Sequence, residues 1–254
     1  MCSIRCRIYD FNKEKEIMKK PKVYKLLAGA FFLLAVFFSL LAIKEYVPFL
    51  KSAYNLENLR QVVVKDIKEQ DVSVDENELR YIDFDMLNEI NPDIVGWLYV
   101  PQIGVDQPIL KGSYDTQYLS NGYDGNYNYL GSIFTWADAN ESLSDANVFL
   151  FGHNMSSGQM FGNLDYFQSQ EFLENNKRVY VYTPSKVRVY EVMDTVVRHK
   201  HDPIFSEKKS IYDDNQQLNL CTCTGYVNTP QRLVVRCKNI KTINALKGRK
   251  ENYE

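Results

Sequence analysis

The longest apolar run in the chain is Leu26–Ile43, near the N-terminus. Its 18 residues include no charged side chain, whereas Lys22 and Lys25 precede it and Lys44 follows it. At about 1.5 Å per residue, a helix of this length rises roughly 27 Å, close to the roughly 30 Å hydrocarbon core of a bilayer. The run therefore predicts a transmembrane anchor over residues 26–43.

The charges around this run predict its orientation. Residues 1–25 carry eight Lys or Arg against three acidic residues, which favours a cytoplasmic N-terminus and an outer position for everything after the anchor. A cleaved signal peptide is the alternative, but its apolar core is usually shorter and no clear A-x-A site follows Ile43. A buried helix of a soluble domain is disfavoured by the basic flank and the missing polar face. Met18 opens the sequence MKKPKVYK, so translation begins at either Met1 or Met18.

Two helical segments are expected after the anchor. Residues 44–81 are charged, with apolar residues near a helical period, and predict a stalk and an N-terminal helix. Phe84–Ile90 predicts a short helix, capped by Asp83 or Asp85 and stopped by Asn91 and Pro92.

Further along, the pattern changes to short apolar runs bounded by Gly, Pro, Asn, Asp or Ser, which is typical of strands. The expected strands are Ile94–Val100, Val105–Leu110, Ser132–Trp136, Asn147–Gly152, Arg178–Thr183, Val187–Val197, Leu218–Thr222 and Arg232–Lys238. A helix is expected within Phe161–Phe172, and a hairpin turn at Thr183–Lys186. The predicted fold is mostly β with accessory helices, a closed or nearly closed eight-stranded barrel within an outer domain over residues 82–254.

Composition narrows the possible partners. The chain has 254 residues and a formal net charge of −2, so no global field favours nucleic acid. It has no zinc-type spacing of Cys and His and no phosphate-binding glycine loop. We therefore expect no nucleic-acid partner and no metal.

The cysteines indicate a reactive thiol in the outer domain. Cys221, Cys223 and Cys237 lie beyond the anchor, and because three is an odd number at least one is unpaired. Cys221 and Cys223 are two residues apart in an expected strand, so their side chains run parallel and do not easily form a disulfide.

Three polar residues fall at predicted strand ends. His153 follows Gly152 at the end of one strand, Cys223 ends another, and Arg232 begins the next after a short loop. Antiparallel strands joined by such a loop bring Cys223 and Arg232 to the same barrel rim. Taken singly, the three also fit a polar loop residue, a buried structural thiol and a surface strand charge. His199 and His201, in a charged strand end, are expected to be solvated.

Several motifs together resemble the sortases, class B in particular. Asn219-Leu-Cys-Thr-Cys223 is similar to their TLxTC motif, Arg232 stands where they carry an arginine, and Phe151-Gly-His153-Asn154 is similar to their histidine segment. Similarity extends over about residues 84–240 and includes Asn91–Trp97, Pro108-Ile-Leu, Tyr118-Leu119 and Gly131–Phe134. The chain departs from the pattern at Asn219, in place of threonine, and at Cys221, where class B members usually have serine. Alignment of the motif favours Cys223 as the nucleophile.

The resemblance implies a cysteine transpeptidase of a Gram-positive cell surface. Catalytic roles would fall to His153, Cys223 and Arg232, with substrate contacts at Tyr118, Leu119 and Thr222 and no cofactor or metal. The partners implied are a surface protein with an NPxTx-like C-terminal sorting motif, an amine of the peptidoglycan cross-bridge, and the membrane. His199–Gln217 resembles the class B loop that covers the substrate, with a helix expected near Ser206–Asp214. An extracellular cysteine hydrolase or protease and a non-catalytic surface scaffold are the alternative functions.

Overall fold

The structure is a computed structural model, and it describes residues 21–66, 80–225 and 229–245. The chain divides into two compact units, Met1–Pro48 and Phe49–Glu254. The predicted cytoplasmic segment 1–25 lies mostly outside the described residues, as do both candidate start positions.

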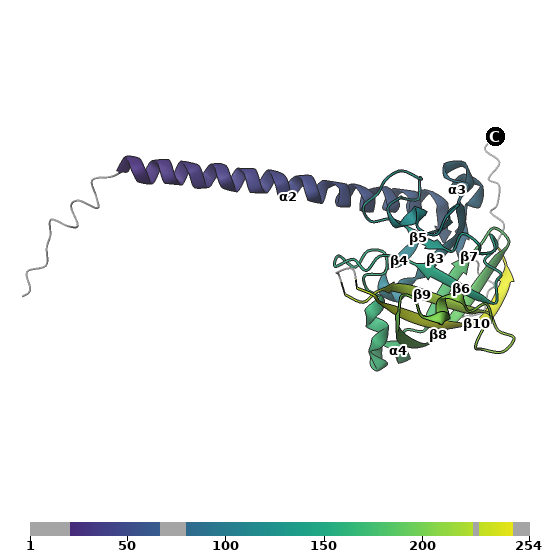
Figure 1. Cartoon of the computed structure of the whole chain (residues 1–254). Coiled ribbons are helices and arrows are strands. Elements are labelled where there is room, and N and C mark those ends of the chain that lie inside the picture. The colour runs from purple at the N-terminus through teal and green to yellow at the C-terminus, as the bar shows by residue number, and fades with distance from the viewer. Residues whose placement is uncertain (1–20, 67–79, 226–228, 246–254) are drawn as a thin grey trace, which may run out of the picture. The chain divides into compact units, whose positions relative to one another are not determined.

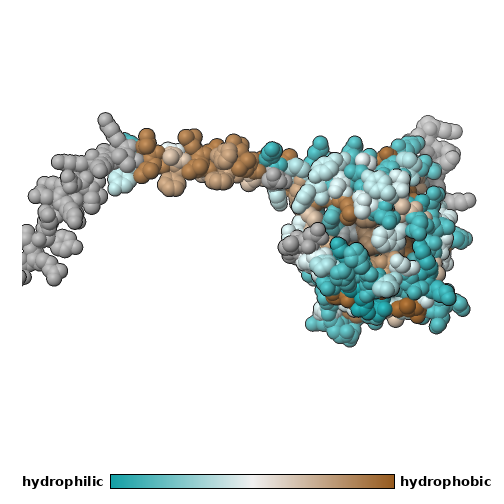
Figure 2. All heavy atoms as spheres, viewed as in Figure 1, coloured by the Kyte–Doolittle hydropathy of each residue, from teal (hydrophilic) through white to brown (hydrophobic). Residues whose placement is uncertain are grey.

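The described part of the first unit is the N-terminal part of α2 (Pro21–Val63). Within α2, an 18-residue window has a mean hydropathy of 2.7 and none of it is buried. Figure 2 shows the hydrophobic side chains on the surface of this segment. By length and composition the helix is able to cross a membrane, as expected for residues 26–43.

The second unit includes the C-terminal end of α2, where Leu59 and Val63 are buried in a core cluster with Trp97 and Leu110. Within the predicted stalk and N-terminal helix of residues 44–81, the helix ends at Val63, and residues 67–79 lie outside the described residues. β1 (Val64–Asp66) follows directly and pairs antiparallel with β2 (Arg80–Ile82). Val62, Val63 and Val64 are β-branched, which favours extended backbone over a further helical turn.

Eight strands form a closed barrel in the order β10-β8-β7-β3-β4-β5-β6-β9, and β9 pairs with β10 to close it (Figure 1). Only the pairs β4–β5 and β6–β9 are parallel among the described strands. The strands are β3 (Ile94–Val100), β4 (Val105–Lys111), β5 (Ile133–Thr135), β6 (Asn147–Phe151), β7 (Arg178–Tyr182), β8 (Lys186–His199), β9 (Gln217–Cys223) and β10 (Gln231–Asn244). The predicted barrel and all eight predicted strands are confirmed.

Short helices and turns connect the strands, and two of them were predicted from their capping and turn-forming residues. In α3 (Phe84–Ile90) the Asp83 side chain accepts a hydrogen bond from the Met86 amide at 3.0 Å, which confirms the predicted cap. The expected hairpin turn between β7 and β8 is also present, because the Thr183 amide donates to the Lys186 carbonyl at 2.8 Å. A short 3-10 helix, η1 (Pro101–Ile103), connects β3 to β4, and another, η2 (Gln117–Leu119), follows β4.

Two helix predictions need correction. The helix expected within Phe161–Phe172 is divided into the 3-10 helix η3 (Leu164–Gln168) and α4 (Gln170–Asn175), because Ser169 between them is extended and caps α4. The helix expected near Ser206–Asp214 is wrong: the loop after β8 contains only the 3-10 helix η4 (Pro203–Ser206). Asp213 has a φ of 54°, in the left-handed region, which ends any regular helix there.

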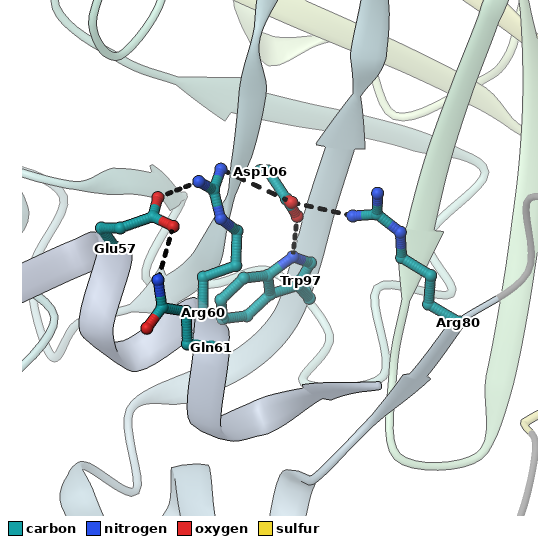
Figure 3. Close-up of polar contacts among 6 residues, drawn as sticks. All are labelled: Glu57, Arg60, Gln61, Arg80, Trp97 and Asp106. Carbon is teal, nitrogen blue, oxygen red and sulfur yellow. Dashed lines mark hydrogen bonds and ion pairs between the residues drawn. The ribbon is translucent and has the colours of Figure 1, made fainter. Parts of the chain in front are cut away.

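A polar cluster joins the end of α2 and β2 to the hairpin of β3 and β4 (Figure 3). The Asp106 carboxylate accepts hydrogen bonds from Trp97 Nε1 at 2.7 Å and from an Arg80 guanidinium nitrogen at 2.8 Å. Arg60, paired with Glu57, lies 3.7 Å from the same carboxylate. The buried Trp97 indole is thus satisfied, and these contacts tie the segments before the barrel to its wall.

Candidate active site

A pocket of about 520 Å³ opens at one rim of the barrel. It is lined by ends of β5, β6, β9 and β10 and by the loops after β4 and β8, with an apolar wall and a few polar groups. Its lining residues are Asp115, Thr116, Leu119, Phe134, Trp136, Phe151, Gly152, His153, Asn154, Lys200, Phe205, Cys221, Thr222, Cys223, Gly225 and Arg232. Segments far apart in the sequence therefore meet at one concave site, and all three predicted catalytic residues line it.

Strand register places Cys223 and Arg232 side by side. They are directly opposite each other in the antiparallel pair β9–β10, so their side chains point to the same face. Cys223 is the last residue of β9 and is partly exposed, while Arg232 is the second residue of β10. The sequence-based expectation that the two share one rim is confirmed.

His153 follows β6 at the same rim and is held on both sides. Its carbonyl accepts a hydrogen bond from the Phe161 amide at 3.0 Å, and its imidazole Nε2 lies 2.7 Å from the Leu119 carbonyl oxygen. The next residue, Asn154, donates from its side-chain amide to the Cys223 carbonyl at 2.9 Å. This last bond ties the histidine segment directly to the end of the cysteine strand.

Cys221 and Cys223 both line the pocket, but they differ in environment. Cys221 is 1% exposed, and burial raises the pKa of its thiol to about 12, although the nearby Arg232 guanidinium acts in the opposite direction. A thiol with such a pKa is almost entirely protonated near neutral pH, and the thiolate is the reactive form. Cys223, at the open end of the strand, is the accessible sulfur. Cys221, Cys223 and Cys237 are free thiols.

The two arginines of β10 have different partners. Arg232 Nη1 donates to the carbonyls of Thr229 at 2.6 Å and Gln231 at 3.0 Å, which holds the guanidinium at the rim. Arg236 instead forms a bidentate ion pair with Asp194 of β8, with both N–O distances at 2.6 Å. Of these two arginines, Arg232 lines the pocket and Arg236 does not, so Arg232 is the one placed to contact a substrate there.

The three residues expected to contact substrate lie in different places. Leu119 is 37% exposed and lines the pocket. Thr222 also lines it, but is only 2% exposed, and its hydroxyl donates to the Gly152 carbonyl at 2.8 Å. Tyr118 is 1% exposed and does not line the pocket. Its substrate contact stays a prediction, and the structure places it in the core.

The aromatic wall of the pocket was not predicted. Phe151 of β6 packs against Trp136, with ring centroids 4.3 Å apart, and against Phe134 at 5.7 Å. Phe205 of the loop after β8 completes the wall. In the sequence, nothing distinguishes these residues from other aromatic residues of strands and loops. Lys200 and Asp115 add opposite charges to the lining.

Metal ligands are not gathered at this site or elsewhere in the described residues, where no group of three or more His, Cys, Asp or Glu side chains is placed to hold an ion. The polar groups at the rim are instead a thiol, an imidazole and a guanidinium. These are the groups that nucleophilic acyl transfer uses: a nucleophile, a proton carrier and a donor to an oxyanion. Fold and pocket together define a candidate cysteine acyltransferase built on a closed β-barrel.

Comparison with known proteins identifies the family. The family model described as the sortase domain matches residues 98–240, more than half of the chain, so the chain belongs to the sortase family. It is 34% identical to sortase B of Listeria monocytogenes over 120 residues, a match that spans 46% of each chain. It is 25% identical to sortase B of Staphylococcus aureus over 184 residues, which covers 62% of this chain and 75% of that one.

The fold comparison agrees with this assignment. The crystal structure of Clostridium perfringens sortase B matches with a TM-score of 0.54 and 25% identity, over 63% of this chain and all of that chain. The relatives and structural neighbours are thus class B sortases, which confirms the resemblance drawn from the motifs. The sortases are a family of cysteine transpeptidases, and the barrel with its rim pocket has the architecture of that family.

Proposed function

We propose that this protein is a membrane-anchored cysteine transpeptidase that attaches a surface protein to the cell wall through a thioester on Cys223. One observation carries the proposal: Cys223 and Arg232 are directly opposed at the rim of the barrel, in the same pocket as His153. Membership of the sortase family supports the same assignment.

In the first half of the reaction, the Cys223 thiolate attacks the carbonyl carbon of the peptide bond after a threonine. The carbonyl oxygen becomes an oxyanion, and Arg232 donates hydrogen bonds to it. When the intermediate collapses, the C–N bond breaks and His153 gives its proton to the leaving amine. The acyl part of the substrate remains on Cys223 as a thioester.

In the second half, an amine of the cell-wall cross-bridge attacks the thioester carbon. His153 takes a proton from the incoming amine, Arg232 again meets the oxyanion, and the Cys223 thiolate leaves. A new amide bond has formed, the Cys223 thiolate and the protonated His153 are regenerated, and the reaction requires no oxidant, metal or cofactor.

The substrate proposed from the family resemblance is an extended C-terminal sorting signal similar to NPxTx. Leu119 and the wall of Phe134, Trp136, Phe151 and Phe205 suit an apolar segment such as one that contains proline, because aromatic faces pack well against proline rings. A complex of Staphylococcus aureus sortase B with substrate is among the structural neighbours. We further propose a single membrane pass over residues 26–43 and an extracellular catalytic domain, which would place the pocket on the side of the cell wall.

Product analysis tests the proposal. The full chain in detergent micelles is incubated with a panel of sorting peptides, with and without an amine acceptor of the cross-bridge type. We expect cleavage after threonine and, with amine present, a transpeptidation product in place of the acid. If the acid is the product whether or not the amine is present, the protein is a cysteine hydrolase instead. The absence of any covalent adduct on Cys223 would contradict an enzymatic function.

A further inference from the structure

The carbonyl of Leu119 determines which nitrogen of His153 carries a proton. Its oxygen lies 2.7 Å from the imidazole Nε2. A carbonyl oxygen accepts hydrogen bonds and cannot donate them, so Nε2 must be the protonated nitrogen. In the neutral ring the lone pair is then on Nδ1, and only Nδ1 is able to take up a further proton.

We propose that the Leu119 main-chain carbonyl is the positioning group of His153, and that Nδ1 is the nitrogen that exchanges protons with the substrate. The inference rests on the proposed transpeptidase function, because it assigns a role within that reaction. As Nδ1 gains a proton, the ring keeps its Nε2–H bond, and the carbonyl dipole stabilises the positive charge. A carboxylate does the same for histidine in many triads.

The peptide before this carbonyl is held rigidly by Tyr118. The phenol of Tyr118 donates to Asp93 Oδ2 at 2.7 Å and accepts from Asn91 Nδ2 at 2.9 Å, and the side chain is 1% exposed. The main-chain carbonyl of Tyr118 accepts from the Ser132 amide at 3.0 Å. A residue pinned at both its side chain and its carbonyl limits how far the adjacent Leu119 carbonyl can move. Tyr118 is therefore a positioning residue in this proposal, acting through the backbone.

Gly131 packs directly against the same carbonyl. A Cβ atom at position 131 would lie 2.6 Å from the Leu119 oxygen and 2.7 Å from the Tyr118 oxygen, closer than real contacts allow, and φ is +60°. Any side chain there must push the two carbonyls away. Glycine at 131 thus leaves room for the Leu119 oxygen to stay where the imidazole meets it.

The test uses the imidazole signals of the full chain in detergent micelles, labelled with ¹⁵N-histidine. The chain has three histidines, so the His153→Gln variant assigns the signal by difference. For the neutral ring of His153 we expect a protonated Nε2, an unprotonated Nδ1 and a slowly exchanging Nε2–H proton. In Gly131→Ala we expect the slow exchange to be lost and kcat to fall by about 10- to 100-fold, with KM changed less than about threefold.

Gly104→Ala is the matched control. Gly104 also has a positive φ, +72°, but an added Cβ meets no described atom within 4 Å. It imposes comparable backbone strain and should leave the His153 signal and kcat unchanged. If Gly131→Ala does not fold, Tyr118→Phe replaces it: the ring stays, the phenol bonds to Asp93 and Asn91 are lost, and a smaller change in the same direction is expected.

A wild-type neutral ring protonated on Nδ1 would overturn the inference, as would an unchanged signal and kcat in Gly131→Ala and Tyr118→Phe alike. The spectroscopic result does not depend on turnover. A protected Nε2–H in a chain that forms no thioester would support the positioning role and reject the transpeptidase. An active chain whose Nε2–H exchanges freely would do the reverse.

Discussion

The two cysteines of β9 should differ in reactivity because only one is buried. We expect the Cys223→Ala variant to react slowly with an aromatic disulfide reagent through Cys221, whereas Cys221→Ser should keep a fast-reacting thiol at Cys223. Cys221 is 1% exposed, and burial raises the pKa of its thiol to about 12.

The expected difference in reaction rate between Cys221 and an ordinary cysteine follows from the raised pKa of the Cys221 thiol. At pH 8 a thiol of pKa about 12 is roughly 10⁻⁴ ionised, against about a quarter for an ordinary cysteine of pKa about 8.5. The more basic thiolate is intrinsically about 40-fold more nucleophilic, for a Brønsted slope near 0.45. The net rate is therefore about 60-fold below an ordinary thiol, before the barrier of reaching a buried sulfur is included.

The assay is stopped-flow absorbance of the released aromatic thiol, in a chain whose Cys2 and Cys6 are changed to serine. Mass spectrometry of peptides assigns the modified residue. Cys237 is fully buried, with its thiol pKa also raised by desolvation, and should react slowly in both variants. If Cys221 in Cys223→Ala reacted within fivefold of Cys223 in Cys221→Ser, the argument from burial would be wrong, and Cys221 would become the candidate nucleophile.

Three further predictions follow from the site and its surroundings. Arg232→Lys should lower kcat by about 10²-fold with little change in peptide binding, because the planar donor fork is lost; single-turnover and binding measurements with a sorting peptide decide this. Arg236→Lys should leave turnover near the wild-type value. Because its pair with Asp194 is partly exposed, the free energy of unfolding should fall by less than about 1 kcal/mol in denaturant titrations, and a large loss of turnover would contradict the different roles of Arg232 and Arg236. Asp106→Ala should lower the free energy of unfolding by about 1–3 kcal/mol in the same titrations, because the Trp97 indole loses its hydrogen-bond acceptor. Since this bond lies away from the active-site pocket, kcat should stay intact, and a selective loss of kcat would refute the prediction.

The sequence alone determined the eight strands of the barrel, although not all of their ends, since β10 continues to Asn244 beyond the predicted Lys238. β3 was predicted from Ile94 to Val100 with its observed bounds, because a short apolar run stands between turn-forming residues. The same punctuation placed His153, Cys223 and Arg232 at strand ends. The shared rim of Cys223 and Arg232 followed because a short loop between antiparallel strands requires adjacent ends. Local chain geometry is sufficient for inferences of this kind.

Only the tertiary structure decided the environment of each side chain. Cys221 and Cys223 have the same parity in one strand, yet Cys221 is buried and Cys223 is partly exposed, a difference that the residue spacing does not predict. The aromatic wall joins β5 and β6 to the loop after β8, and the bond from His153 to the Leu119 carbonyl spans 34 positions. The loop after β8 also lacks the predicted helix, since Asp213 takes a left-handed conformation there. Burial, pKa and the choice of hydrogen-bond partner depend on contacts between segments that are distant in the sequence. The spacing of apolar residues, every two positions in a strand or every 3.6 in a helix, carries no information about these contacts.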